Sequence, residues 1–150
     1  MSEIKEFKRD YPLRILKIYK KYGDFSEFSF SFALMTFQSV MAVLGDAQGK
    51  NLAKEIQQND LKKDLAKYSF FYSPNDNQND YWDCFKNLRN ASSHMLQNYT
   101  PENNEHKFVK ISYTTNKMGR KEYKEITSKD LKNFLLTLLS LLNKEDSSLK

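Results

Sequence analysis

The sequence has 150 residues, the usual length of one domain and enough to bury a hydrophobic core. Hydrophobic residues make up 39% of it and aromatic residues 14%, so the composition excludes an intrinsically disordered protein. The net charge of +5 would suit an anionic partner, although an ordinary surface of mixed charge explains it equally well.

Glycine and proline are scarce, with 4 and 3 residues, and this favours helices over a turn-rich sheet protein. A single cysteine, Cys84, excludes an intrachain disulfide and is expected in the core. Residues 1–5 lack the apolar stretch of a signal peptide, and no run approaches the about 18 apolar residues of a membrane span. We therefore expect a cytoplasmic protein that does not enter a membrane.

Two helices are predicted in the N-terminal third of the chain. Asp10 can cap the first helix with Pro12 in its first turn, and Gly23 suits the position after its last residue. The second helix follows a cap at Asp24 or Ser26, and its apolar residues fall on two faces. Such a helix is either the central helix of the monomer or part of a homodimer interface, and the sequence favours neither.

A break at residues 45–49 separates these helices from a helical segment predicted over residues 51–71, which Asn59-Asp60 can interrupt. The acidic residues of this segment stand among lysines, so we interpret them as a solvated charged face rather than a functional carboxylate cluster. They are Glu55, Asp60 and Asp64.

A polar loop at residues 73–80 leads into a helix predicted over residues 81–96, which Asp80 can cap. Tyr81 and Trp82 at the start of this helix could stack on nucleic-acid bases. Aromatic residues at this spacing are more often part of a hydrophobic core, so we favour a packing role for both.

Alternating apolar residues predict strands at residues 107–113 and 121–126, joined by a segment in which Gly119 can turn the chain. Basic residues crowd this hairpin, where they could follow an RNA backbone or simply keep an exposed hairpin soluble. The candidate RNA-binding residues are Lys110, Lys117, Arg120 and Lys121.

The last helix is predicted to begin after a cap at Thr127 or Ser128, and its apolar residues recur with the helical period. Residues 144–150 are expected to be a frayed tail. The sequence therefore predicts a mainly α protein, a bundle of four to five helices with one β-hairpin before the last helix. Residues 1–143 would form its single domain.

The helix predicted around Trp82 also contains an arginine and a histidine that suit RNA cleavage. Asn90 and His94 are four residues apart and share a helix face, so Asn90 can orient the histidine ring. A histidine can donate or accept a proton near neutral pH, and an arginine can bind a phosphate and stabilise its developing charge. Arg89 points away from His94 but can curl back toward it, or reach the histidine of a second copy. Because the 2′-hydroxyl of RNA can be the attacking group, such a site needs no metal or other cofactor.

The segment Arg89-Asn90-Ala91-Ser92-Ser93-His94 resembles the signature of the HEPN family. In that signature an arginine, commonly followed by a polar residue such as asparagine, precedes a histidine by four to six intervening residues. HEPN domains are helical and usually dimeric, and many are metal-independent ribonucleases of toxin–antitoxin, abortive-infection and CRISPR systems. A charged hairpin and a Leu-rich last helix after the motif are also similar to several small members. Some members carry a tyrosine two residues after the histidine, and here Leu96 stands at that position.

The resemblance implies an endoribonuclease of toxin or antiphage-defence type, with one composite site where the motifs of a homodimer meet. Arg89 and His94 would be its catalytic residues, with Asn90 and Ser93 positioning them. The implied partners are RNA, a second copy of the chain, and an antitoxin or other regulatory protein. The alternative is a catalytically silent HEPN-like helical module that binds RNA or a protein partner without cleaving RNA.

Overall fold

The computed structural model is mainly helical, as predicted. It describes residues 7–23, 29–71, 80–92, 99–101, 109–117 and 120–148, and it describes side chains at 9–23, 30–71, 80–90, 92 and 126–143. The helices of this part are α1 (Phe7–Tyr22), α2 (Ser29–Leu44), α3 (Lys50–Asn59), α4 (Tyr81–Ser92) and α5 (Ser128–Ser148). Two 3-10 turns are η1 (Ala47–Gly49) and η2 (Leu65–Lys67), and three strands are β1 (Tyr99–Pro101), β2 (Val109–Lys117) and β3 (Arg120–Thr127).

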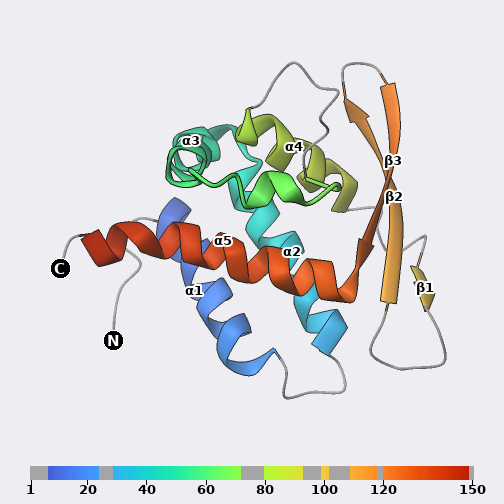
Figure 1. Ribbon diagram of the computed structural model, residues 1–150, viewed down its shortest axis with the longest axis horizontal. Coiled ribbons are helices and arrows are strands. Elements are labelled where there is room, and N and C mark those ends of the chain that lie inside the picture. Colours follow the sequence, from blue (N-terminus) through green and yellow to red (C-terminus); the bar gives the residue numbers. More distant parts are fainter. Residues whose placement is uncertain are drawn as a thin grey trace.

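The helices pack around α2, which contacts α1, α4 and α5. Helices α3 and α4 lie together on one side of α5, and α1 lies on the other side (Figure 1). The strands form a sheet at one end of the molecule, where β2 packs against α4 and β3 runs directly into α5 (Figure 1). This arrangement brings the end of α4 next to the sheet.

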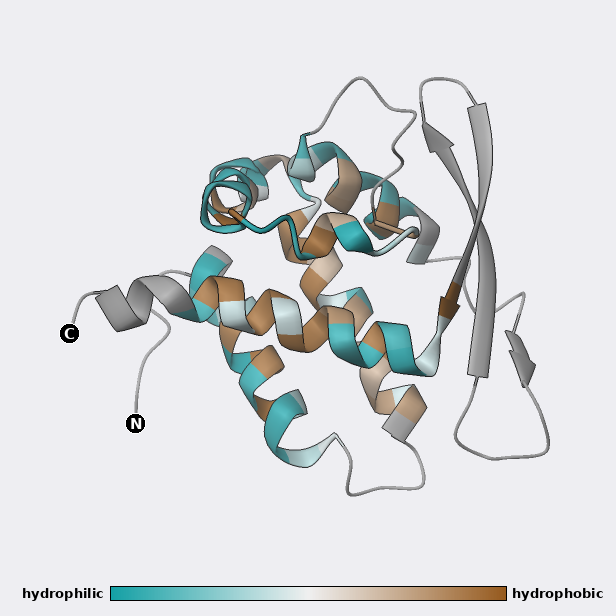
Figure 2. Cartoon of the chain, in the orientation of Figure 1, coloured by the Kyte–Doolittle hydropathy of each residue, from teal (hydrophilic) through white to brown (hydrophobic). Residues whose placement is uncertain are grey.

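An aromatic cluster forms the centre of the core. The ring of Phe134 in α5 lies 6.0 Å from Phe37, 5.6 Å from Tyr68, 5.0 Å from Phe70 and 5.6 Å from Phe71, between ring centroids. Such offset and edge-on contacts are the favourable geometries for aromatic rings. Hydrophobic residues face inward on the helices around this cluster (Figure 2). The predicted apolar residues of the last helix are all buried: Leu131, Phe134, Leu135, Leu138 and Leu142.

Helix α2 is the central helix of the monomer, one of the two expectations for a helix that is apolar on two sides. Phe37, Val40, Met41 and Leu44 have no exposed surface. The second apolar side is less well covered, because Met35 remains 66% exposed. Within the described ranges no single helix is both long and apolar enough to span a membrane. The bent pair Phe30–Leu44 and Ala47–Asn59 has the required length and composition only when its two helices are taken together.

The first helix starts earlier than predicted. It begins at Phe7 rather than after a cap at Asp10, so Pro12 lies inside α1 instead of in its first turn. Lys8 and Arg9 form helix readily, and α1 continues through Pro12 although the proline removes the hydrogen bond of its N–H and its ring crowds the carbonyl four residues earlier. The predicted end is confirmed, because the N–H of Gly23 donates to the carbonyl of Tyr19 at 2.7 Å.

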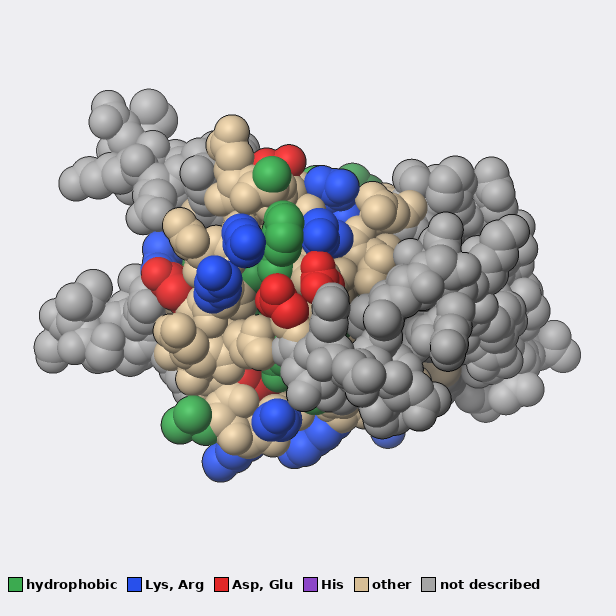
Figure 3. Space-filling view, turned by 90° about the horizontal axis from the view of Figure 1, so that it is seen from above, with side chains coloured by type: hydrophobic (Ala, Val, Ile, Leu, Met, Phe, Trp, Pro, Cys, Tyr) green, Lys and Arg blue, Asp and Glu red, His purple; other side chains and the backbone are tan. Residues whose placement is uncertain are grey.

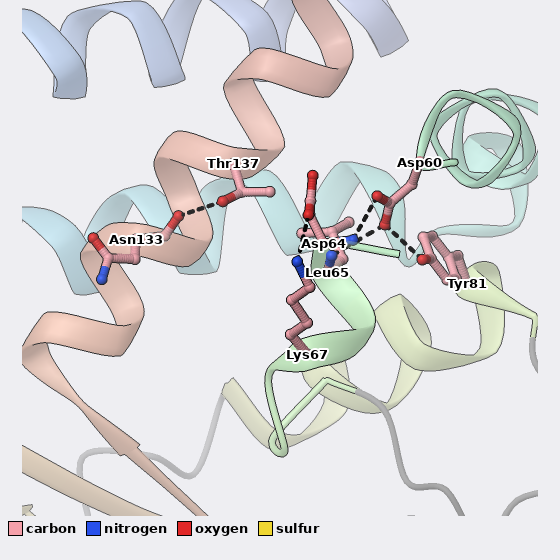
Figure 4. Close-up of polar contacts among 7 residues, drawn as sticks. All are labelled: Asp60, Asp64, Leu65, Lys67, Tyr81, Asn133 and Thr137. Atoms are coloured by element: carbon pink, nitrogen blue, oxygen red, sulfur yellow. Dashed lines mark hydrogen bonds and ion pairs between the residues drawn. The ribbon is translucent and has the colours of Figure 1, made fainter. Parts of the chain in front are cut away.

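The interruption predicted at Asn59-Asp60 is confirmed, but the helix predicted to continue to residue 71 is wrong. Helix α3 ends at Asn59, and a turn then leads into the short η2. The turn holds Lys63 at a φ of 54°, in the left-handed region that a side chain makes unfavourable. Asp60 stabilises it, since its carboxylate accepts hydrogen bonds from the N–H groups of Asp64 at 2.7 Å and Leu65 at 3.0 Å (Figure 4).

Asp60 therefore does not belong to a solvated face, which corrects that part of the sequence interpretation. It is only 4% exposed, and it also accepts the hydroxyl of Tyr81 at 2.6 Å. One of the donors that replace water around its carboxylate, the Tyr81 hydroxyl, therefore comes from α4, which is distant from Asp60 in the sequence. Glu55 and Asp64 remain partly exposed and pair with Arg9 at 3.4 Å and Lys67 at 3.0 Å.

The predicted hairpin is present, but it belongs to a three-stranded antiparallel sheet of order β1-β2-β3. The extra strand β1 was not among the predicted strands, and it pairs Tyr99 with Ile111. Strands β2 and β3 extend to Lys117 and Arg120, which pair with each other. Threonine favours extended structure, so the segment after Tyr113 continues the strand instead of turning. Gly119 lies outside the described residues.

The last helix is capped as predicted, because the hydroxyl of Thr127 accepts the N–H of Asp130 at 3.1 Å. It runs to Ser148, past Asn143, so the backbone of residues 144–148 is helical where a frayed tail was expected. Lys144 and Glu145 are good helix formers and no proline or glycine interrupts the helix, so the chain continues it.

Replacing Asp60 by asparagine should lower the free energy of unfolding by about 1–3 kcal/mol. Each carboxylate oxygen accepts a backbone N–H, so either orientation of the asparagine amide turns an N–H toward another donor. Tyr81→Phe removes one hydroxyl and should cost less, about 1 kcal/mol. Urea unfolding measures both, and an Asp60→Asn protein as stable as the parent would contradict this role.

Candidate functional site

Helix α4, which carries the first part of the motif, is fixed firmly where it begins. Oδ1 of Asp80 accepts the N–H of Trp82 at 3.0 Å, which confirms Asp80 as the predicted cap. The side chain of Gln57 in α3 accepts the N–H of Tyr81, also at 3.0 Å. The start of α4 is therefore tied to α3, and the direction of the helix is set before it reaches Arg89.

One face of α4 is buried and the other carries polar and aromatic side chains. Trp82, Lys86 and Arg89 are only partly buried and are spaced at i, i+4 and i+7, so they lie along one side of the helix. The buried residues lie on the adjacent side that faces the core: Tyr81, Cys84, Phe85, Leu88 and Ser92. Cys84 is 1% exposed, as expected for a core cysteine.

Arg89 lies in the last turn of α4 with an accessible guanidinium group. Its side chain is 38% exposed. Nη2 donates to Oδ1 of Asn90 at 3.3 Å, and Nη1 lies 3.8 Å from Oδ1 of Asp46. Two neighbours thus orient the guanidinium while part of it still faces solvent. A group held in this way can bind a phosphate through two parallel hydrogen bonds.

Asn90 contacts Arg89, and its predicted contact with His94 falls outside the described residues. Ser93 and His94 lie outside the described residues, as does the predicted stretch of helix after Ser92. The described part of the site is therefore Arg89 and Asn90. Within it, the side chain of Asn90 accepts a hydrogen bond from the arginine.

The end of α4 is braced by α2. Nε2 of Gln38 donates to the carbonyl of Ser92 at 2.9 Å, and the hydroxyl of Ser92 donates to the carbonyl of Arg89 at 2.7 Å. The first bond joins the last described turn of α4 to α2, and the second lies within that turn. Gly45, just after α2, lies against the same turn. A Cβ on Gly45 would be 2.7 Å from the carbonyl oxygen of Phe85 and 2.9 Å from Cβ of Arg89.

Asp46 connects the loop after α2 to two points on α4. Its Oδ2 accepts the N–H of Gln48 at 3.1 Å, which holds the carboxylate against its own loop. Its carbonyl oxygen accepts Nε1–H of Trp82 at 3.0 Å, and its Oδ1 faces Arg89. No pattern in the sequence predicts this contact, because Asp46 is distant from α4 along the chain and has no motif around it.

The basic hairpin residues do not form one cluster. Lys117 pairs with Arg120 and Lys121 with Asn116, so these three basic residues share the end of the hairpin at the turn. Lys110 pairs with Thr127 near the start of α5. At about 3.4 Å per residue, the seven positions from Lys110 to Lys117 cover roughly 24 Å. The candidate RNA-binding residues are thus divided between the two ends of the hairpin.

A surface hollow of about 500 Å³ lies between α3, η2 and the start of α4. Lys54, Gln58, Leu61 and Tyr81 are among its lining residues, and Arg89 is not. Across the described ranges no group of three or more His, Cys, Asp or Glu side chains is arranged to hold a metal ion.

No protein-family model matches the sequence, and comparisons with curated proteins and with solved structures find no match. The interpretation of this site therefore depends on the residues of the motif and on what surrounds Arg89.

Gly45→Ala should lower the free energy of unfolding by about 1–3 kcal/mol, because the added methyl group forces α2 and α4 apart beside Arg89. Gln48→Ala is a matched control in the same loop, since that side chain is exposed, and it should have little effect. Thermal and urea unfolding measure both variants. Equal stability of the Gly45→Ala protein and the parent would show that this close approach is unimportant.

Proposed function

We propose that this protein is a metal-independent endoribonuclease of toxin or antiphage-defence type, with Arg89 and His94 as catalytic residues. The observation that supports this most directly is the guanidinium of Arg89, which is braced by Asn90 and Asp46 yet 38% exposed. His94 follows Arg89 at the spacing of the HEPN signature. Together they supply a phosphate-binding cation and a group that can transfer protons near neutral pH.

In the proposed reaction the 2′-hydroxyl of RNA attacks the adjacent phosphorus, and the bond from phosphorus to the 5′ oxygen breaks. His94 removes the proton of the 2′-hydroxyl as a general base, or donates a proton to the leaving 5′ oxygen as a general acid. Arg89 stabilises the negative charge that increases on the phosphate in the transition state. The products are a 2′,3′-cyclic phosphate and a 5′-hydroxyl end.

The proposal includes a homodimer in which the motifs of two subunits form one composite site, as the family resemblance implies. It also includes control by an antitoxin or other regulatory protein, because an unregulated ribonuclease would damage the cell that makes it. The alternative is a catalytically silent module that binds RNA or a protein partner. Three basic residues at one end of the hairpin, Lys117, Arg120 and Lys121, favour this alternative, because they could hold RNA without any help from Arg89.

The parent protein should cleave RNA in the presence of EDTA, and Arg89→Ala and His94→Ala should each reduce the rate at least about a hundredfold. His106→Ala, which changes the other histidine of the chain, should leave the rate unchanged. Gel analysis of digested tRNA and mRNA measures cleavage, and circular dichroism confirms folding. A folded His94→Ala protein that cuts as fast as the parent would exclude the proposed centre, and RNA binding without any cleavage would favour the silent module.

A composite site predicts that two inactive variants can restore each other. In a heterodimer of Arg89→Ala and His94→Ala subunits, the intact arginine of one subunit can act with the intact histidine of the other. We expect such heterodimers, isolated through two different affinity tags, to regain part of the parental cleavage rate. Doubly tagged His94→Ala dimers are the control and should remain inactive. Heterodimers that stay as inactive as this control would contradict a shared site.

A further inference from the structure

An anchored indole ring with two lysines around it lies on the same side of α4 as Arg89. Nε1–H of Trp82 donates to the carbonyl of Asp46 at 3.0 Å, which fixes the edge of the ring. Nζ of Lys86 lies 3.8 Å from the ring centroid and Nζ of Lys50 lies 5.0 Å from it. Both distances are within the range of cation–π attraction. The ring packs against the hydrophobic core, in line with the packing role favoured by the sequence, but it is only partly buried.

The indole and the guanidinium are separated by a distance that suits a short stretch of nucleic acid. Trp82 and Arg89 are seven residues apart on one helix, or about 10 Å at 1.5 Å per residue. Each strand of duplex DNA advances by about 3.4 Å per nucleotide, so a single strand stacked at a similar spacing would span this distance with about three nucleotides. Lys86 stands between the two residues, and Lys50 reaches the same ring from α3.

We propose that Trp82, Lys50, Lys86 and Arg89 form a binding strip for single-stranded RNA, an inference that rests on the proposed function and specifies the class of RNA on which the site acts. A base stacks on the indole of Trp82, and the lysines move from the ring to the neighbouring phosphates. The strand then passes along α4, and Arg89 holds the phosphate to be cleaved. Bases in a duplex are already stacked on each other, so the indole selects unpaired bases.

The acidic neighbours of the strip do not prevent this binding. Lys86 pairs with Asp83 at 3.0 Å, but the two side chains are 35% and 27% exposed, and such partly exposed pairs contribute little. Lys50 is exposed, and the contact described for its ammonium group is the one with the ring. On the face where α3 and α4 lie, basic side chains stand on both sides of a hydrophobic group, with acidic side chains close by (Figure 3). The ammonium groups of Lys50 and Lys86 can therefore move from the ring to a phosphate with little loss of free energy.

The test measures RNA binding apart from cleavage. Full-length His94→Ala protein is titrated into a fluorescent single-stranded oligoribonucleotide and into the duplex of the same sequence, with fluorescence anisotropy as the readout. Lys50→Gln should weaken single-strand binding about three- to tenfold and reduce the slope of log affinity against log salt by about 0.7. Lys67→Gln removes the same charge from a lysine that pairs with Asp64 instead, and should change affinity less than about twofold.

A second pair of variants tests the ring itself. Trp82→Leu should weaken single-strand binding about tenfold, whereas Trp82→Phe should recover most of it, because a base can stack on either aromatic ring. Equal effects of Lys50→Gln and Lys67→Gln, or binding that is no weaker in Trp82→Leu, would overturn the strip. Tighter binding of duplex than of single strand would overturn it as well. Strip-dependent binding by a parent protein that never cleaves would support the strip and contradict the ribonuclease. Cleavage by a parent protein whose RNA affinity does not change in the strip variants would support the ribonuclease and contradict the strip.

Discussion

The close approach of α2 to α4 at Gly45 determines how the candidate site is built. Because Gly45 has no side chain, the end of α2 lies against the turn of α4 that contains Phe85 and Arg89. This proximity lets Gln38 reach the carbonyl of Ser92 and lets Asp46 reach the guanidinium of Arg89. A larger residue at position 45 would remove several contacts together, because all of them depend on the same spacing between the helices.

Local signals in the sequence predicted the helices well where the deciding contact lies within a few residues. Asp80 and Thr127 cap their helices as expected, because each bonds to a backbone N–H two or three residues later. The predictions were wrong where a distant partner decides the structure. Asp60 is buried where it accepts a hydrogen bond from a hydroxyl of α4, and β1 is a strand because it pairs with β2.

In the candidate site, too, the residues that are close together in the sequence could be predicted, and those from other elements could not. The motif identified Arg89 and Asn90 from residue types alone, and the structure brings these two side chains into contact. The spacing of Trp82, Lys86 and Arg89 could have revealed their shared side of α4, because i, i+4 and i+7 is a helical pattern. Lys50 and Asp46 could not be found in this way, since they come from α3 and from the loop after α2.

Asp46 raises the question of whether a carboxylate beside Arg89 would exclude a phosphate. The separation is 3.8 Å and both side chains are more than one-third exposed, so the attraction is worth at most about 1 kcal/mol. A phosphate bound by two parallel hydrogen bonds gains more from the same guanidinium, because these bonds are charge-assisted. Asp46 cannot follow the arginine, since Gln48 and Trp82 hold its two ends. It therefore restricts the directions available to Arg89 while yielding to a stronger ligand, which is the behaviour that a pre-organised phosphate-binding group requires.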